Sequence, residues 1–368
     1  MEEPLVAATT ITSLAFAIGI VFGFVGNKTN FCTLGAVSDI VNMGDWSRMR
    51  MWMLAIAVAV LGTAVLGLTG LFDVSKSIYT GSKLIWLSSI VGGTCFGIGM
   101  TLASGCGSKT LIRIGGGNLK SLVVFVFLGI GAYMTMRGLF GVWRVRFLDS
   151  VAIELPHGQD IPSFIASAGM APETALLAAA TVIGGGLLVA ALSSREAWRS
   201  DVLIGGIVIG SLTLVGWYVS GHLGFVAEHP ETLEEAFIGT NSGRAESLTF
   251  VAPVAYTLEL LMLWSDSSRV LTFGIASALG VIVGSALYAL FSKGFRLEGF
   301  RDPDDLIRHI VGAVLMGFGG VTAFGCTIGQ GITGFSTLAL GSILTTAAII
   351  AGAAATMKIQ YWLMMREG

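Results

Sequence analysis

Long runs of apolar residues, separated by short polar segments, recur along the whole chain. A helix needs about 17–25 consecutive apolar residues to cross a bilayer, and most of these runs reach that length. We therefore predict about nine to ten transmembrane helices. The runs cover residues 5–25, 51–71, 85–103, 119–136, 175–192, 202–219, 271–290, 310–324 and 338–355.

Three further apolar segments, at 31–43, 108–114 and 327–338, are each too short to span a bilayer. They are typical of half-helices or re-entrant segments, which a membrane protein tolerates only where they pack in protein or line a cavity. When such interrupted segments occupy corresponding places in two halves of a chain, they indicate the central site of a transporter. The polar segment 148–172 is predicted to be an exposed loop.

Two of these breaks carry near-copies of one phrase. Residues 97–106 read Gly-Ile-Gly-Met-Thr-Leu-Ala-Ser-Gly-Cys, and residues 317–326 read Gly-Phe-Gly-Gly-Val-Thr-Ala-Phe-Gly-Cys. A shift of 220 residues places Cys106 on Cys326 and also superimposes several glycines. We therefore predict two pseudo-symmetric halves, 1–145 and 201–368, related as in an inverted repeat, with 146–200 as a connecting loop and span.

Composition agrees with a membrane protein. The chain is 54% hydrophobic and 12% charged, whereas a soluble domain has about 25% charged residues. The predicted fold is an all-α integral membrane protein. The net charge of −2 argues against nucleic-acid binding. The acidic loop 221–247 favours the non-cytoplasmic side, while the other loops leave the orientation open.

Cys32, Cys106 and Cys326 each follow a break and precede the predicted start of a helix. The free N–H groups and the dipole at a helix N-terminus attract anions. This pattern indicates a site for an anion that also presents sulfur. The neighbouring candidate binding residues are Gly105, Gly107, Ser108, Gly325, Thr327 and Gln330.

Other interpretations of the cysteines compete with this one. A buried cysteine is often only a small hydrophobic residue, and Cys95 is predicted to be one. Structural zinc needs closely spaced Cys and His ligands, and the chain has no such spacing. We therefore predict neither a metal nor a cofactor.

Several charged residues lie within or beside the apolar segments. Asp39 and Glu259 are candidates for coupling transport to a cation, because ionisable residues at membrane depth are expensive and usually functional. Lys28 and Lys109, with Arg113, are candidates for steering an anion towards the mouths. All of these side chains could instead lie at the interface with the lipid headgroups.

The most specific motifs are Gly-Asn-Lys-Thr-Asn-Phe-Cys at 26–32, Ser-Gly-Cys at 104–106 with Gly-Gly-Asn at 116–118, and the phrase at 315–331. With these motifs the chain resembles the YeeE/YedE family, whose characterised members take up thiosulfate. The resemblance implies an hourglass of spanning and short helices in a bacterial inner (plasma) membrane. It implies passage of thiosulfate along Cys32, Cys106 and Cys326 by weak S–H···S hydrogen bonds. It further implies a TusA-like sulfur-carrier protein as a partner.

We thus predict a protein that is not an enzyme and takes up a small sulfur anion, most plainly thiosulfate. Three alternatives stay open. The protein could be a membrane sulfurtransferase that forms a cysteine persulfide, a transporter of a selenium-containing or other sulfur anion, or a scaffold with structural cysteines. Moving two negative charges into a cell costs about 4.6 kcal/mol at 100 mV, so uptake needs a coupled cation or rapid consumption.

Overall fold

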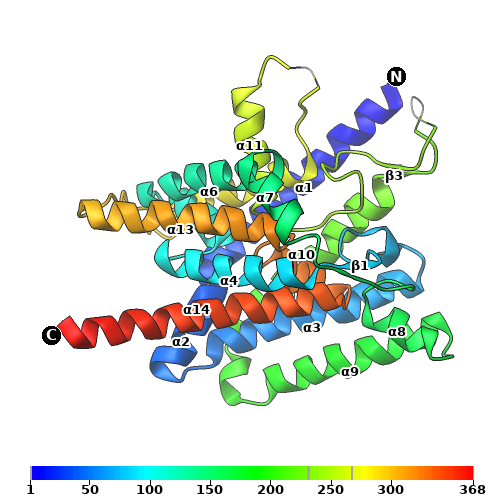
Figure 1. Ribbon diagram of the computed structural model, residues 1–368, viewed down its shortest axis with the longest axis horizontal. Coiled ribbons are helices and arrows are strands. Elements are labelled where there is room, and N and C mark those ends of the chain that lie inside the picture. The colour runs from blue at the N-terminus through cyan, green and yellow to red at the C-terminus, as the bar shows by residue number, and fades with distance from the viewer. Residues whose placement is uncertain (1, 230–232, 267, 368) are drawn as a thin grey trace.

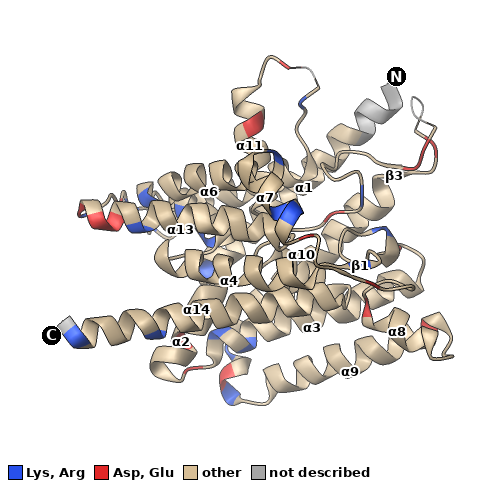
Figure 2. Ribbon diagram, viewed as in Figure 1, with Lys and Arg blue, Asp and Glu red and all other residues tan. Residues whose placement is uncertain are grey.

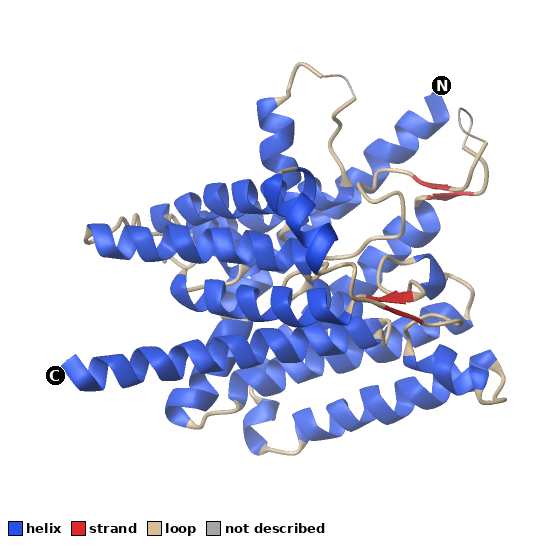
Figure 3. Ribbon diagram, viewed as in Figure 1, coloured by secondary structure: helices blue, strands red, loops and turns tan. Residues whose placement is uncertain are grey.

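Helices make up most of the structure (Figure 3), a computed structural model that describes residues 2–229, 233–266 and 268–367. Within that described part, nine helices are long and apolar enough to cross a membrane. The prediction of an all-α integral membrane protein is therefore confirmed. The nine are α1 (Glu2–Lys28), α3 (Ser47–Leu68), α4 (Trp86–Leu102), α6 (Leu119–Arg137), α9 (Pro172–Leu192), α10 (Ser200–Tyr218), α12 (Phe273–Phe291), α13 (Pro303–Thr322) and α14 (Leu340–Glu367).

Shorter elements connect the long helices. The short helices are α2 (Thr33–Met43), α5 (Gly107–Gly115), α7 (Leu139–Phe147), α8 (Ile161–Ser167) and α11 (Ala252–Met262), with single turns η1 (Val74–Lys76), η2 (Arg195–Trp198), η3 (Val219–Leu223) and η4 (Gly329–Gly334). Two small antiparallel ribbons pair β1 (Lys83–Leu84) with β2 (Ile153–Glu154) and β3 (Phe225–Val226) with β4 (Ala236–Phe237). The predicted half-helices at 31–43 and 108–114 are confirmed as α2 and α5, whereas segment 327–338 holds only the π-helical turn η4.

The segment 148–172 is largely exposed, as predicted, but it is not a loop throughout, because it contains β2 and α8. Asp160 caps α8 by accepting the Ser163 N–H at 3.0 Å, and Pro162 occupies the first turn, where proline is well tolerated. These two local signals favour a short helix, although the overall polarity of the segment favours a loop.

The motif helices α4 and α13 cross at glycines, and their contacts are reciprocal. A Cβ placed on Gly92 would lie 2.7 Å from the nitrogen of Ala323, and one on Gly312 would lie 2.7 Å from that of Ala103. Under the shift of 220 residues, Gly92 corresponds to Gly312 and Ala103 corresponds to Ala323, so the two contacts are equivalent. A pair of contacts that exchange in this way is the signature of a local two-fold axis. The two helices are antiparallel, so their breaks are approached from opposite ends.

The same relation extends to the helices on either side. A Cβ on Gly97 of α4 would meet the carbonyl of Ile349 in α14, and one on Gly317 of α13 would meet the carbonyl of Leu128 in α6. These small residues let helix backbones approach closely, as is usual where lipid gives no hydrophobic driving force. The boundaries of the two halves at 145 and 201 stay a prediction.

Figure 1 shows the long helices running broadly along the horizontal axis, with the N-terminus at the right and the C-terminus at the left. Lysine and arginine cluster at the end of the molecule where α13 begins and α14 ends (Figure 2), which we call the basic end. The segments that hold β1, β2 and α8 lie towards the opposite end. Arg48, Lys109, Arg113, Lys120 and Arg296 line two neighbouring cavities, which share Lys109 and Arg113.

Candidate functional site at three helix breaks

One backbone motif precedes each of the three candidate cysteines. Two positions before the cysteine, a residue other than glycine takes the left-handed conformation: Asn30 (φ 52°), Ser104 (φ 56°) and Phe324 (φ 58°). The residue between then donates its N–H to a carbonyl five positions back, which ends the preceding helix in a Schellman motif. These bonds join Phe31 to Gly26 at 3.0 Å, Gly105 to Met100 at 2.9 Å and Gly325 to Gly320 at 2.8 Å.

After each stop, the cysteine sulfur lies over the first turn of the next helical segment. The Gly35 N–H donates to Cys32 Sγ at 3.4 Å, and the Gly329 N–H donates to Cys326 Sγ at 3.4 Å. Cys106 is the N-cap residue of α5, and its sulfur lies 3.3 Å from Ser108 Oγ. Each sulfur therefore lies at the start of a helical segment, and those of Cys32 and Cys326 accept a main-chain N–H there.

The three breaks bring the thiols together. The side chains of Cys32 and Cys106 are neighbours, and Thr327, the residue after Cys326, lies beside Cys106. Cys106 and Cys326 are fully buried, whereas Cys32 is partly exposed. The order along this line, which we call the cysteine line, is Cys32, Cys106, Cys326. Cys95 is also partly exposed, and it belongs to α4 rather than to a break.

Buried polar atoms beside the cysteine line lack partners among the described residues. The Oγ1 atoms of Thr33 and Thr327 and the Oε1 atom of Gln330 are buried without a hydrogen bond. Thr327 also lies next to the thiol of Cys106. An unsatisfied buried polar group costs about 1–3 kcal/mol, so a cluster of them calls for an explanation. Hydroxyl groups so placed can donate to the oxygens of an anion.

A cavity of about 430 Å³ reaches Cys32 from the basic end, and we call it the basic cavity. Arg48, Lys109 and Arg113 line it. Two of these cations bond to the left-handed residues of the breaks: Lys109 Nζ to Asn30 Oδ1 at 2.5 Å, and Arg113 to the Ser104 carbonyl at 2.6 Å.

Two cavities approach the cysteine line from the opposite end. One, of about 270 Å³, is lined by Tyr79, Phe324 and Gln330, and we call it the opposite cavity. The other, of about 260 Å³, shares Tyr79 and Phe324 with it and reaches Gly325, the residue before Cys326. The Gln330 amide, which donates to the Ala323 carbonyl, lies between the opposite cavity and the break. The cysteine line therefore separates cavities that approach it from the two ends.

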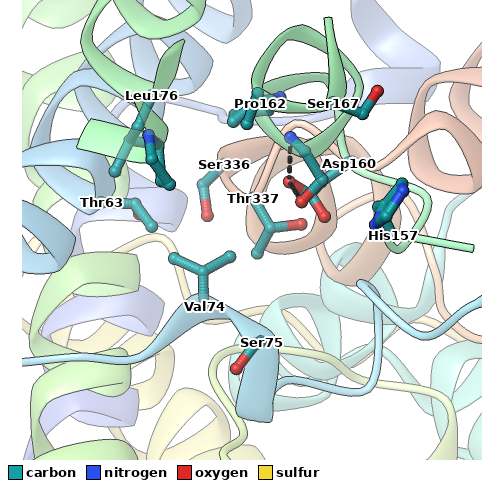
Figure 4. A pocket seen from close by; sticks show the side chains of 13 residues that line it. Thr63, Val74, Ser75, His157, Asp160, Pro162, Ser167, Leu176, Ser336 and Thr337 are labelled. Atoms are coloured by element: carbon teal, nitrogen blue, oxygen red, sulfur yellow. Dashed lines mark hydrogen bonds between the residues drawn. The ribbon is translucent and has the colours of Figure 1, made fainter. Parts of the chain in front are cut away.

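A further cavity, of about 450 Å³, lies beside α8 and α9 (Figure 4). Its lining reaches Ser336 and Thr337, just after η4, but it contains no cysteine. Asp160 is already engaged in capping α8, and Ser336 Oγ accepts the indole N–H of Trp217 at 3.1 Å. In the described part of the chain, no lysine or arginine lines this cavity, which makes it a poor place for a doubly charged anion.

The charged candidates fall in different places. Asp39 is buried and pairs with Arg48 at 2.6 Å. Arg48 lines the basic cavity, whereas Asp39 itself does not. Glu259 is buried in α11, where it pairs with Arg269 at 3.2 Å, and it lines none of the cavities described above. Lys28 is exposed and lines none of them either. The structure thus brings Lys109 and Asp39 near the cysteines but does not bring Lys28 or Glu259 there.

The loop before α11 contains one carboxyl group with a displaced pKa. Burial raises the pKa of Glu246, against the hydrogen bonds that its side chain accepts from the N–H groups of Asn241 and Ser242. A raised pKa in the folded state contributes stability that is fully present below the ordinary value of 4.5 and is lost as the pH rises through the folded value.

We therefore expect Glu246→Gln, which keeps the acceptor oxygen but cannot ionise, to be more stable than the parent protein near neutral pH. The gain should be about 1 kcal/mol, and it should vanish in acid. Thermal unfolding in detergent micelles, followed by tryptophan fluorescence over a series of pH values, measures this difference. A gain that grows as the pH falls would contradict the assignment.

Comparison with known proteins points to one family. The family model described as sulphur transport matches residues 28–355. The chain is 27% identical over 332 residues to the thiosulfate transporter TsuA of Escherichia coli (strain K12), covering 85% of this chain and 84% of that protein. It is 26% identical over 342 residues to the thiosulfate transporter TsuA of Spirochaeta thermophila, covering 91% and 94%.

Proposed function

Because this chain belongs to the sulphur transport family, known also as YeeE/YedE, we propose that it carries thiosulfate across the membrane along Cys32, Cys106 and Cys326. The observation that carries this proposal is the common construction of the three breaks. Each presents a thiol and a set of main-chain N–H groups to the same interior line, between cavities that approach from the two ends.

Thiosulfate has two chemically different ends, and the site offers a match for each. A neutral thiol is a weak hydrogen-bond donor and acceptor, so it meets the outer sulfur of the anion without trapping it. The oxygens require stronger donors, and the hydroxyls of Ser108, Thr33 and Thr327 with the helix N-termini supply them. Passage needs sites that bind well enough to admit the anion and weakly enough to release it.

The proposed direction follows from charge. Cytoplasmic loops are enriched in lysine and arginine, so we place the basic end in the cytoplasm of a bacterial inner membrane. Thiosulfate then reaches Gln330 from the opposite cavity and leaves past Cys32 into the basic cavity. A TusA-like sulfur carrier would receive it at the basic end.

Uptake of a doubly charged anion needs a source of free energy besides the route itself. Two negative charges entering an inside-negative cell meet a cost of about 4.6 kcal/mol at 100 mV. Rapid use of the anion by a carrier would keep its internal concentration low. Alternatively, a cation that enters with the anion would offset the cost, and the Asp39–Arg48 pair beside the basic cavity is the proposed place for this coupling.

The test is uptake into proteoliposomes of thiosulfate labelled either in its outer or in its inner sulfur. Equal accumulation of both labels as intact anion supports transport. Outer label retained on the protein, with the inner sulfur left outside as sulfite, would instead establish sulfur transfer to a cysteine. If neither outcome is seen and a selenium-containing or another sulfur anion accumulates instead, that anion rather than thiosulfate is the substrate.

A further inference from the structure

The basic cavity holds more positive charge than its surroundings neutralise. Arg48 is paired with the carboxylate of Asp39. Among the ion pairs of the described residues, neither Lys109 nor Arg113 has a carboxylate partner. Both side chains are only partly exposed, so water and salt screen their charges less than they screen those of a fully exposed residue.

The two uncompensated cations are held in position by neutral groups. Lys109 Nζ donates to Asn30 Oδ1, and the Arg113 guanidinium donates to the carbonyl of Ser104. The two residues are four positions apart on α5, so they lie on the same face of that helix. An ammonium group has three donors and a guanidinium has five, which leaves donors available after these bonds. The arrangement is a preorganised receptor for negative charge.

We infer that the basic cavity is a second anion site, at the Cys32 end of the cysteine line, that takes a doubly charged tetrahedral oxyanion such as sulfate or thiosulfate. Cys32 lines this cavity, and its sulfur is therefore next to the bound anion. The role of the site rests on the proposed function: it draws the anion off Cys32 and holds it before release. Sulfate from the cytoplasm would compete for it and slow uptake.

The position of Cys32 supplies a test that does not depend on transport. The Cys95→Ala protein in phospholipid-free micelles is treated with a negatively or a positively charged methanethiosulfonate reagent, and modification of Cys32 is quantified by mass spectrometry. We expect the negative reagent to react about tenfold faster, because the uncompensated charges of Lys109 and Arg113 attract it. Sulfate at constant ionic strength should slow the reaction in a saturable manner.

Neutralising either cation should weaken protection by sulfate about tenfold, as measured in Lys109→Gln and Arg113→Gln. Arg113→Lys, which keeps the charge, should retain most of it. Lys83→Gln is the matched control, since Lys83 lines the opposite cavity. Protection is the ratio of the Cys32 modification rates without and with sulfate in the same variant. A substitution that changes the intrinsic reactivity of Cys32 therefore leaves this ratio unchanged.

Two results would overturn the inference. One is that sulfate fails to protect Cys32, or protects the Lys109→Gln and Arg113→Gln proteins as well as the parent. The other is that micelles containing phosphatidylglycerol reproduce the protection and sulfate adds nothing, which would assign the cations to a lipid headgroup. Protection by sulfate without any thiosulfate uptake would keep the anion site and reject only its role in transport.

Discussion

Replacing Cys106 with alanine is expected to reduce thiosulfate uptake about 100-fold or more, equivalent to about 2.7 kcal/mol at the hardest step of passage. Cys106 is the fully buried thiol that contacts Cys32 and lies beside Thr327. Its loss interrupts the cysteine line at its centre, and no neighbouring sulfur can take its place. Initial rates of uptake into proteoliposomes measure the effect.

Two comparisons make this result specific to the thiol. Cys95→Ala removes a thiol that lies outside the cysteine line, in the middle of α4, and should leave uptake unchanged. Cys106→Ser keeps the size and a donor but replaces a weak sulfur contact with a stronger hydroxyl one, so it should bind the anion and release it slowly. Thermal unfolding of each variant reports whether the fold is retained. Normal uptake by a folded Cys106→Ala protein would remove the thiols from the mechanism.

The breaks and their repetition could be predicted from the sequence because they depend on local signals. Glycines and a short apolar segment, set among runs long enough to cross a membrane, identify α5. The shift of 220 residues relates the phrase before α5 to the phrase that ends in Cys326. The left-handed residues could not be predicted in the same way. Serine and phenylalanine rarely adopt a positive φ, so nothing in Ser104 or Phe324 signals the shared stop.

The surroundings of the site were also beyond sequence reasoning, since they join residues far apart in the chain. Lys109 and Asn30 are 79 positions apart, and the hydrogen bond between them depends on how α5 packs beside the first break. Asp39 and Glu259 seemed equivalent as buried carboxylates, yet only the arginine partner of Asp39 lines the basic cavity. Tertiary packing, rather than residue type, decides which of these charges faces the route.

The second half contains a short helix comparable to α2, which a search for cysteine misses. Helices α2 and α11 each have 11 residues, and Phe31-Cys32 precedes the first as Phe250-Val251 precedes the second. Val251 is buried, so the second half has a hydrophobic residue where the first has a thiol. The two short helices therefore agree in length but not in chemistry, and the backbone before them differs, because Cys32 is extended (φ −161°, ψ 121°) whereas Val251 is helical (φ −99°, ψ −58°). This asymmetry places the additional thiol towards the basic end, where we propose that the anion leaves.

The crossing of α4 and α13 holds the breaks of Cys106 and Cys326 in register, and Gly312→Ala is expected to disrupt it. The added Cβ would lie 2.6 Å from the Gly99 carbonyl oxygen and 2.7 Å from the Ala103 nitrogen. Both are backbone atoms, so the clash cannot be relieved by turning a side chain, and the helices must separate. We expect a loss of about 3 kcal/mol or more, at the upper end for overpacking.

The local two-fold axis sharpens this expectation. Gly99→Ala places its Cβ 2.6 Å from the Gly312 carbonyl oxygen, so the two single substitutions should destabilise the protein to similar extents. Gly185→Ala in α9 is the matched control, because a Cβ there meets nothing within 4 Å and alanine favours the helix. Thermal unfolding in micelles, with the monodisperse fraction after heating, ranks the variants. If Gly312→Ala proved as stable as Gly185→Ala, close backbone contact would not be what aligns the two breaks, and the route between them would need another scaffold.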